Sequence, residues 1–202
     1  MKIWGLESAV DQALQACGLG RAVTNIIWAR LGDIENHDPE SYRHSLAVGL
    51  HTYELSALLS LDPKTALISG LLHDTGKITV DADILTKQGA LTDQDWMQIK
   101  GHPRASYDIL KRDFPREAAI AYIHHRYQKN PYPDVAFDPA NDAYGRLIAS
   151  ADFFDATMTR TNAAGAAAKT KEDIIGRFAI TRPDQLVHAT VLSRKRAGIY
   201  AA

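Results

Sequence analysis

Gly70-Leu71-Leu72-His73-Asp74-Thr75-Gly76-Lys77 is the stretch that decides how this chain folds, because an apolar helical pattern ends there abruptly in polar residues. Gly76 can adopt the left-handed conformation that terminates a helix. Asp74 has two carboxylate oxygens, so it can bridge two cations at the separation of roughly 3.5 to 4 Å that two-metal hydrolysis uses. Lys77 would then lie near an anionic substrate. Taken alone, the His-Asp dipeptide could instead be an exposed pair at a capped helix end.

Helical spacing of apolar residues dominates outward from this stretch, and strict alternation is scarce. Asp38-Pro39 and Asp62-Pro63 each combine a capping aspartate with a proline suited to a first helical turn, and they bracket a predicted helix over about 40–61. Thr92 followed by Asp95 is close to a capping box. Further helices are predicted over about 5–17, 21–32, 64–74, 92–100, 103–112, 115–125, 142–160 and 184–197.

The segment Lys129 to Asn141 holds three prolines, so we expect a loop there. The length of 202 residues is enough for one substantial core. We therefore expect one continuous domain over residues 38–202, with the helices of residues 1–37 packing on it.

The amino-acid composition excludes several classes of binding partner. The net charge of −1 and the lack of a basic block exclude the electrostatic footprint of a protein that grips long nucleic acid, so a phosphorylated substrate should be small. No stretch approaches the roughly 18 apolar residues of a membrane span, and no secretory signal is evident, so we expect a cytoplasmic protein without membrane contact. Cys17 is the single cysteine, which rules out an internal disulfide.

The chemistry-bearing residues are mostly histidines. Any one histidine on an apolar helix is more often a structural residue than a ligand, but several together with acids indicate a metal site. Imidazole and carboxylate suit iron, manganese, zinc or nickel, and the lack of thiolates argues against a cysteine zinc site. The candidates are His44, His73, Asp74, His102, His124, His125 and Asp152.

In order and spacing, these residues resemble the HD superfamily of metal-dependent phosphohydrolases, and within it the HD-GYP branch. The resemblance covers about residues 38–160 and implies an all-α HD-domain helical bundle with a Pro-rich loop after the His-His pair. The matching elements are Asp38-Pro39 before His44-Ser45, Leu72 to Lys77, Ile84 to Thr92, His102-Pro103, His124-His125, and Ala151 to Ala156.

The resemblance also implies a ligand set. One metal would be held by His44, His73, Asp74 and Asp152, and a second by His102, His124 and His125, with Asp74 shared. This gives two divalent ions (Fe, Mn, Zn or Ni). Glu40, one helical turn before His44, resembles the carboxylate that binds a third metal in some members. Alternatively, Glu40 is a solvated acid near a helix start. Asp155 is expected to be a hydrogen-bond partner of the site rather than a ligand.

The motifs expected to contact substrate differ from those of the HD-GYP branch. Asn130-Pro131-Tyr132-Pro133 replaces the Gly-Tyr-Pro element, and Arg126 stands where the branch has glutamate. Arg160 resembles the arginine of a later Arg-Pro-Tyr element, of which Thr161-Asn162 replaces the rest. With Lys77, the residues Tyr132, Arg126 and Arg160 are the predicted substrate-binding residues, and Asp74 and Lys77 are the predicted catalytic ones.

The function implied is a phosphodiesterase that uses a metal-activated water to cleave a cyclic dinucleotide, cyclic di-GMP foremost, or a related small phosphoester. Two alternatives stay open: a di-iron oxygenase of the same superfamily, and a non-catalytic metal-binding signalling module. Lys77 and the ordered HD-GYP elements favour hydrolysis. The sequence leaves the oligomeric state open, a homodimer included.

Overall fold

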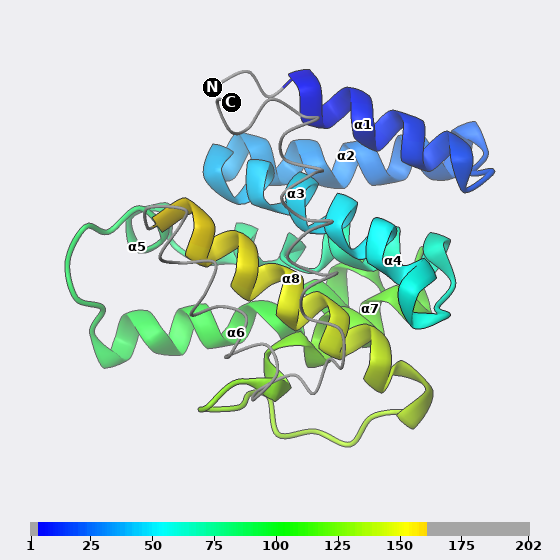
Figure 1. Ribbon diagram of the computed structural model, residues 1–202. Helices are drawn as coiled ribbons and strands as arrows, with labels where there is room; N and C mark the ends of the chain where they lie inside the picture. Colours follow the sequence, from blue (N-terminus) through cyan, green and yellow to red (C-terminus); the bar gives the residue numbers. More distant parts are fainter. Residues whose placement is uncertain (1–3, 161–202) are drawn as a thin grey trace.

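The structure is a computed structural model that describes residues 4–160 (Figure 1). This part of the chain is all-α, as predicted, and contains no strand. Its α-helices are α1 (Trp4–Ala16), α2 (Arg21–His37), α3 (Pro39–Ser56), α4 (Pro63–Leu72), α5 (Ala82–Leu85), α6 (Asp93–Leu110), α7 (Pro115–Ile123) and α8 (Asp142–Arg160). Short 3-10 helices are η1 (Ala57–Leu59), η2 (Thr75–Thr79), η3 (His124–Tyr127) and η4 (Pro139–Asn141).

The predicted capping residues start the helices that they were assigned to. Asp38 accepts hydrogen bonds from the first backbone N–H groups of α3, and the Asp62 side chain accepts the Thr65 N–H of α4 at 2.9 Å. Thr92 and Asp95 form a complete capping box at the start of α6. Local sequence chemistry therefore fixes where three of the helices begin.

The predicted break between two helices at residues 100–103 is wrong, because α6 runs unbroken through Pro103. A proline has no N–H, so it leaves the carbonyl four residues earlier without its helical donor. That carbonyl belongs to Ile99, and the Nδ1 of His102 lies 2.6 Å from it. A histidine side chain thus replaces the missing backbone donor. The short helix α5 was not predicted, and the helix predicted over 184–197 lies outside the described residues.

Helix α3 lies at the centre of the bundle and contributes to two hydrophobic clusters. Leu46 and Leu50 belong to a cluster shared with α1, α2, α4, α6 and α7. Val48 and Leu55 belong to a second cluster, shared mainly with α8 and to a smaller extent with α4 and α7. The amino-terminal helices α1 and α2 lie side by side against α3 (Figure 1), so they share the core of the remaining helices. The domain boundary at residue 38 stays a prediction.

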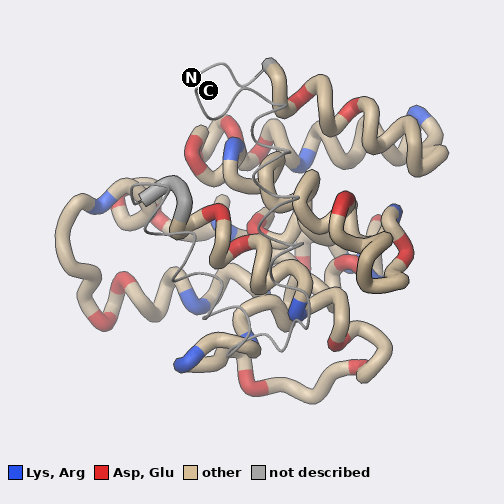
Figure 2. The backbone as a smooth tube through the Cα atoms, viewed as in Figure 1, with Lys and Arg blue, Asp and Glu red and all other residues tan. Residues whose placement is uncertain are grey.

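Charges of both signs are interspersed along the described backbone in Figure 2, without a continuous basic stripe. Between residues 4 and 160, no helix combines the length and the hydropathy that a bilayer span needs. The expectations of a small substrate and a cytoplasmic location stay predictions.

Two glycines allow α3 and α4 to cross closely. A Cβ atom on Gly70 would lie 2.2 Å from Thr52 Oγ1 and 3.0 Å from the Gly49 Cα atom. A Cβ atom on Gly49 would in turn lie 2.4 Å from the Leu71 side chain. The crossing sets how closely His44 on α3 approaches the residues that follow α4.

We expect Gly70→Ala to lower the free energy of unfolding by about 1 to 3 kcal/mol, because the Thr52 hydroxyl must move to admit the methyl group while the α3 backbone is already in tight contact. Gly32→Ala is the matched control, since that glycine is also helical but has open space around its Cβ position. The control should be neutral or stabilise by up to about 1 kcal/mol. Urea unfolding measures both, and an equally stable Gly70→Ala variant would contradict the close crossing.

Candidate metal centre

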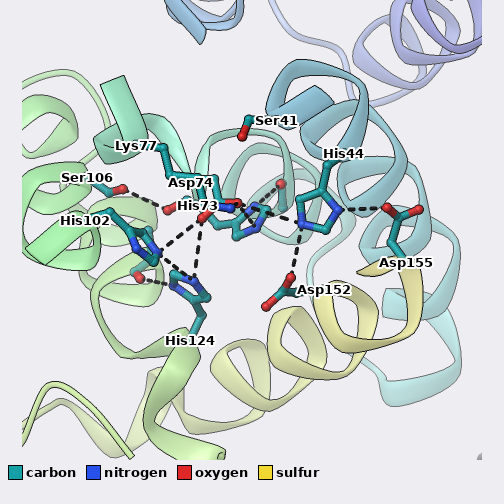
Figure 3. Close-up of polar contacts among 12 residues, drawn as sticks. Ser41, His44, His73, Asp74, Lys77, His102, Ser106, His124, Asp152 and Asp155 are labelled. Atoms are coloured by element: carbon teal, nitrogen blue, oxygen red, sulfur yellow. Dashed lines mark hydrogen bonds and ion pairs between the residues drawn. The ribbon is translucent and has the colours of Figure 1, made fainter. Parts of the chain in front are cut away.

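Asp74 lies at the centre of a group of imidazoles, in the turn between α4 and η2 (Figure 3). Its Oδ2 atom is 3.2 Å from His73 Nε2 and 3.8 Å from His44 Nε2. Its Oδ1 atom is 3.2 Å from His102 Nε2 and 3.9 Å from His124 Nε2. Each carboxylate oxygen therefore faces its own pair of imidazoles, which is the arrangement of a bridging ligand.

Three of these imidazoles are held in the same way. The Nδ1 atoms of His73, His102 and His124 lie 2.8, 2.6 and 2.5 Å from the backbone carbonyl oxygen three residues earlier. His73 and His124 follow directly after α4 and α7, where terminal carbonyls lack a helical donor. Because each Nδ1–H donates to a carbonyl, each Nε2 carries its lone pair toward Asp74.

His44 is held by a carboxylate instead of a carbonyl. Its Nδ1 atom lies 2.8 Å from Asp155 Oδ2, and its Nε2 atom lies 3.0 Å from Asp152 Oδ1. Both acids come from α8, three residues apart. Asp155 therefore sits behind the His44 ring, away from Asp74 (Figure 3), in the position expected of a hydrogen-bond partner.

The ligand atoms fall into two groups, within each of which all atoms lie within 4.8 Å of one another: Asp74 with His102, His124 and His125, and Asp74 with His44 and His73. Asp152 lies outside both groups, although it contacts His44. Sequence reasoning assigned the same two sets, with Asp152 added to the His44 side. The structure brings these residues together from α3, α6, α8 and the ends of α4 and α7.

The buried atoms of the centre suit a cation. His73 Nε2 and Asp74 Oδ1 are buried and form no hydrogen bond within the described part of the chain. Buried acceptors without a donor cost free energy, and a divalent ion between them would offset that cost. The chemistry of these residues therefore fits metal ions on both sides of Asp74.

The protonation states also suit a metal site. Burial, together with the neighbouring His73 and His102, lowers the pKa of His124 to about 3. Burial, with His124 and His102, holds the pKa of His125 well below its usual range. Burial opposes ionisation of Asp74, but positive charge close to it, including the Lys77 ammonium, holds the pKa of that carboxyl well below its ordinary value. Neutral imidazoles and an ionised carboxylate are the forms that bind metal.

Lys77 lies next to Asp74. Its Nζ atom is 2.5 Å from Asp74 Oδ2. Burial disfavours its charge, but the carboxylates of Asp74 and Asp152 raise the pKa of the ammonium above its usual value. Lys77 therefore stays a cation next to the shared carboxylate.

The other predicted residues lie in different surroundings. Tyr132 stacks on the His125 ring with 4.7 Å between centroids, so it borders the centre. Arg126 donates to the Val135 carbonyl at 2.9 Å, and its guanidinium lies 4.6 Å from the centroid of the Phe137 ring. It thus holds the Pro-rich loop. The side chain of Arg160 lies outside the described residues.

Glu40 does not join either ligand group. Its side chain is 80% exposed, and its Oε2 atom lies 3.1 Å from Arg43 Nε. Helical spacing places Glu40 on the same face as His44, but it does not show that Arg43, next to His44, binds the Glu40 carboxylate.

Sequence reasoning missed Ser106 and gave the wrong reason for Gly76. Gly76 does not have a positive φ angle. A Cβ atom there would lie 2.1 Å from the His102 carbonyl oxygen and 2.5 Å from Ser106 N. Ser106 Oγ donates to the His73 carbonyl and accepts the Gly76 N–H, both at 2.8 Å. The only signal for Ser106 was its place one helical turn after His102.

The sequence profile described as the HD domain matches residues 41–157, which is more than half of the chain and includes every histidine of the centre. The chain belongs to the HD domain family. This membership confirms the predicted fold class, an all-α HD bundle.

Curated relatives of this HD-domain chain are named phosphodiesterases. The cyclic di-GMP phosphodiesterase response regulator RpfG of Xanthomonas campestris is 39% identical over 93 residues, which cover 44% of this chain and 25% of that protein. A cyclic di-GMP phosphodiesterase of Thermotoga maritima is 30% identical over 134 residues, covering 62% and 36%. The 3'3'-cGAMP-specific phosphodiesterase 2 of Vibrio cholerae is 30% identical over 131 residues, covering 61% and 25%. The matched part therefore spans about a quarter to a third of these relatives.

Solved structures share the fold. The HD domain of the Listeria monocytogenes phosphodiesterase PgpH, in complex with cyclic-di-AMP, superposes with a TM-score of 0.59 at 20% identity, covering 85% of this chain and 97% of that one. A second structure of the same HD domain gives a TM-score of 0.58 at 17% identity, with 85% and 99% covered. At this identity the likeness supports the fold alone.

We expect Ser106→Ala to lower the free energy of unfolding by about 1 to 3 kcal/mol, because it leaves the buried Gly76 N–H without an acceptor. Ser8→Ala, at an exposed position of α1, is the matched control and should change stability by less than about 0.5 kcal/mol. Urea unfolding of the two variants without added metal measures the difference. Equal stability would show that Ser106 does not fasten the Asp74 turn to α6.

Proposed function

We propose that this HD-domain chain is a metal-dependent phosphodiesterase that cleaves a cyclic dinucleotide. The observation that carries the proposal is the buried carboxylate of Asp74, each of whose oxygens faces its own pair of imidazoles. Two divalent ions held in this way would supply an activated water and neutralise charge on phosphoryl oxygens.

Each residue of the metal centre then has a defined role. His44 and His73, with Asp152 beside them, would hold one ion, and His102, His124 and His125 would hold the other. Asp74 would be shared by the two sites, and the carbonyl and Asp155 contacts of the imidazoles fix the direction of their lone pairs. Lys77 keeps its positive charge at the shared carboxylate, where it can bind a non-bridging phosphate oxygen.

Cyclic di-GMP is the first substrate to test. Among the relatives, some are named for cyclic di-GMP and others for 3'3'-cGAMP, and both molecules join two nucleotides through phosphodiester bonds. Tyr132 adds an aromatic ring at the border of the centre, which suits a nucleobase. The loop that Arg126 holds differs from the HD-GYP pattern, so a direct assay must distinguish between these dinucleotides as substrates.

Metal binding should stabilise the fold, because only the folded chain brings the ligands together. We expect Mn²⁺ at about a hundred times its dissociation constant to add about 2.7 kcal/mol to the free energy of unfolding. Asp74→Asn should abolish most of this gain, since an amide cannot bridge two cations. Urea unfolding with and without Mn²⁺ measures the effect, and a gain that persists in Asp74→Asn would refute the assignment.

Turnover is tested with cyclic di-GMP, 3'3'-cGAMP and cyclic-di-AMP on the Mn²⁺- and Fe²⁺-loaded protein, with chromatographic detection of linear dinucleotides. We expect hydrolysis of at least one of them, and loss of about 10²-fold or more in kcat/KM for Lys77→Ala. Lys64→Ala, at an exposed site at the start of α4, is the matched control and should retain full activity.

Two outcomes would favour the alternatives. Activity that disappears without oxygen would indicate an oxygenase. Metal binding without turnover of any dinucleotide or of a generic bis-phosphoester would indicate a non-catalytic module.

A further inference from the structure

Arg43 is a buried cation directly before His44 on α3. Only 5% of its side chain is exposed, and it lies between two carboxylates. Its Nε atom is 3.1 Å from Glu40 Oε2, and its Nη2 atom is 3.3 Å from Asp155 Oδ2. Its guanidinium is a cation that can donate hydrogen bonds but cannot accept them.

The arginine is linked to the metal centre through Asp155. The Oδ2 atom of that fully buried aspartate also accepts the Nδ1–H of His44 at 2.8 Å. One carboxylate oxygen thus binds the guanidinium on one side and the imidazole on the other. Asp155 lies behind the His44 ring, opposite the Nε2 atom that faces Asp74 and Asp152 (Figure 3).

The buried atoms without partners differ between the two places. At Asp74 they are acceptors, namely His73 Nε2 and Asp74 Oδ1, and acceptors of this kind can bind metal ions. At Arg43 the buried atom without a hydrogen bond in the described part of the chain is Nη1, which is a donor and cannot bind a cation. A divalent ion placed beside the guanidinium would also be repelled by it.

We propose that the Arg43 guanidinium takes the place of a third metal ion at Glu40, so that this chain binds two divalent ions. Glu40 is then the outer counter-ion of Arg43 and not a metal ligand. Arg43 is in addition a positioning residue, because it fixes the aspartate that orients His44. The inference rests on the two-ion centre proposed above.

The first test counts ions. Apo protein is loaded with Mn²⁺, freed of excess ion by gel filtration and analysed by plasma mass spectrometry, for the wild type and Glu40→Gln. We expect two ions per chain in both. Three ions in the wild type and two in Glu40→Gln would overturn the role of Arg43 and leave the two-ion centre standing. Fewer than two ions in the wild type would instead remove the proposed centre and this inference with it.

The second test measures positioning. Competition with a chelating dye gives two Mn²⁺ dissociation constants for the wild type, Arg43→Gln and Arg43→Lys. In Arg43→Gln we expect one Mn²⁺ dissociation constant to rise by about 10-fold or more, which is the usual effect of mutating a hydrogen-bond partner of a metal-ligating histidine. The other Mn²⁺ dissociation constant should change by less than about 3-fold. Arg43→Lys keeps the charge without the forked geometry and should fall between.

Arg112→Gln, which removes an exposed arginine paired with Asp113, is the matched control and should change neither constant. Circular dichroism establishes that each variant is folded, and Arg43→Lys decides the matter if Arg43→Gln does not fold. Two unchanged constants in the folded Arg43 variants would overturn the positioning role.

Discussion

The side chain of Asp74 is 2% exposed, and its carboxylate oxygens lie 3.2 to 3.9 Å from four imidazole nitrogens. An ionised group at this depth is costly unless charges and hydrogen-bonding groups surround it. The surrounding groups come from α3, α6 and the ends of α4 and α7, so the centre exists only when these helices meet. The close crossing at Gly49 and Gly70 and the close approach at Gly76 bring them within range.

One structural device recurs in the imidazole shell. His73, His102 and His124 each donate from Nδ1 to a carbonyl that the helix leaves without a donor. For His73 and His124 the cause is the end of a helix, and for His102 the cause is Pro103. The same contact satisfies the backbone and directs Nε2 toward Asp74. Ligand geometry and helix termination are therefore a single feature of this fold.

The residues predicted to bind substrate are positioned differently from the metal ligands. Arg126, which stands where a glutamate was expected, binds the loop backbone at Val135 and lies over the Phe137 ring. Tyr132 from the same loop stacks on His125. The departure from the HD-GYP pattern could be read in the sequence, but its consequence could not, because it depends on which loop atoms come within reach of the guanidinium.

The sequence by itself determined the helix starts at Asp38, Asp62 and Thr92, since capping involves only neighbouring residues. It also determined the ligand types and their order along the chain, through motifs short enough to recognise. The tertiary structure alone decided that α6 continues through Pro103, that Gly76 is required by close contact with α6, and that Arg43 engages Glu40. These outcomes depend on distances between atoms far apart in the chain or on competition for one partner, and a linear pattern records neither.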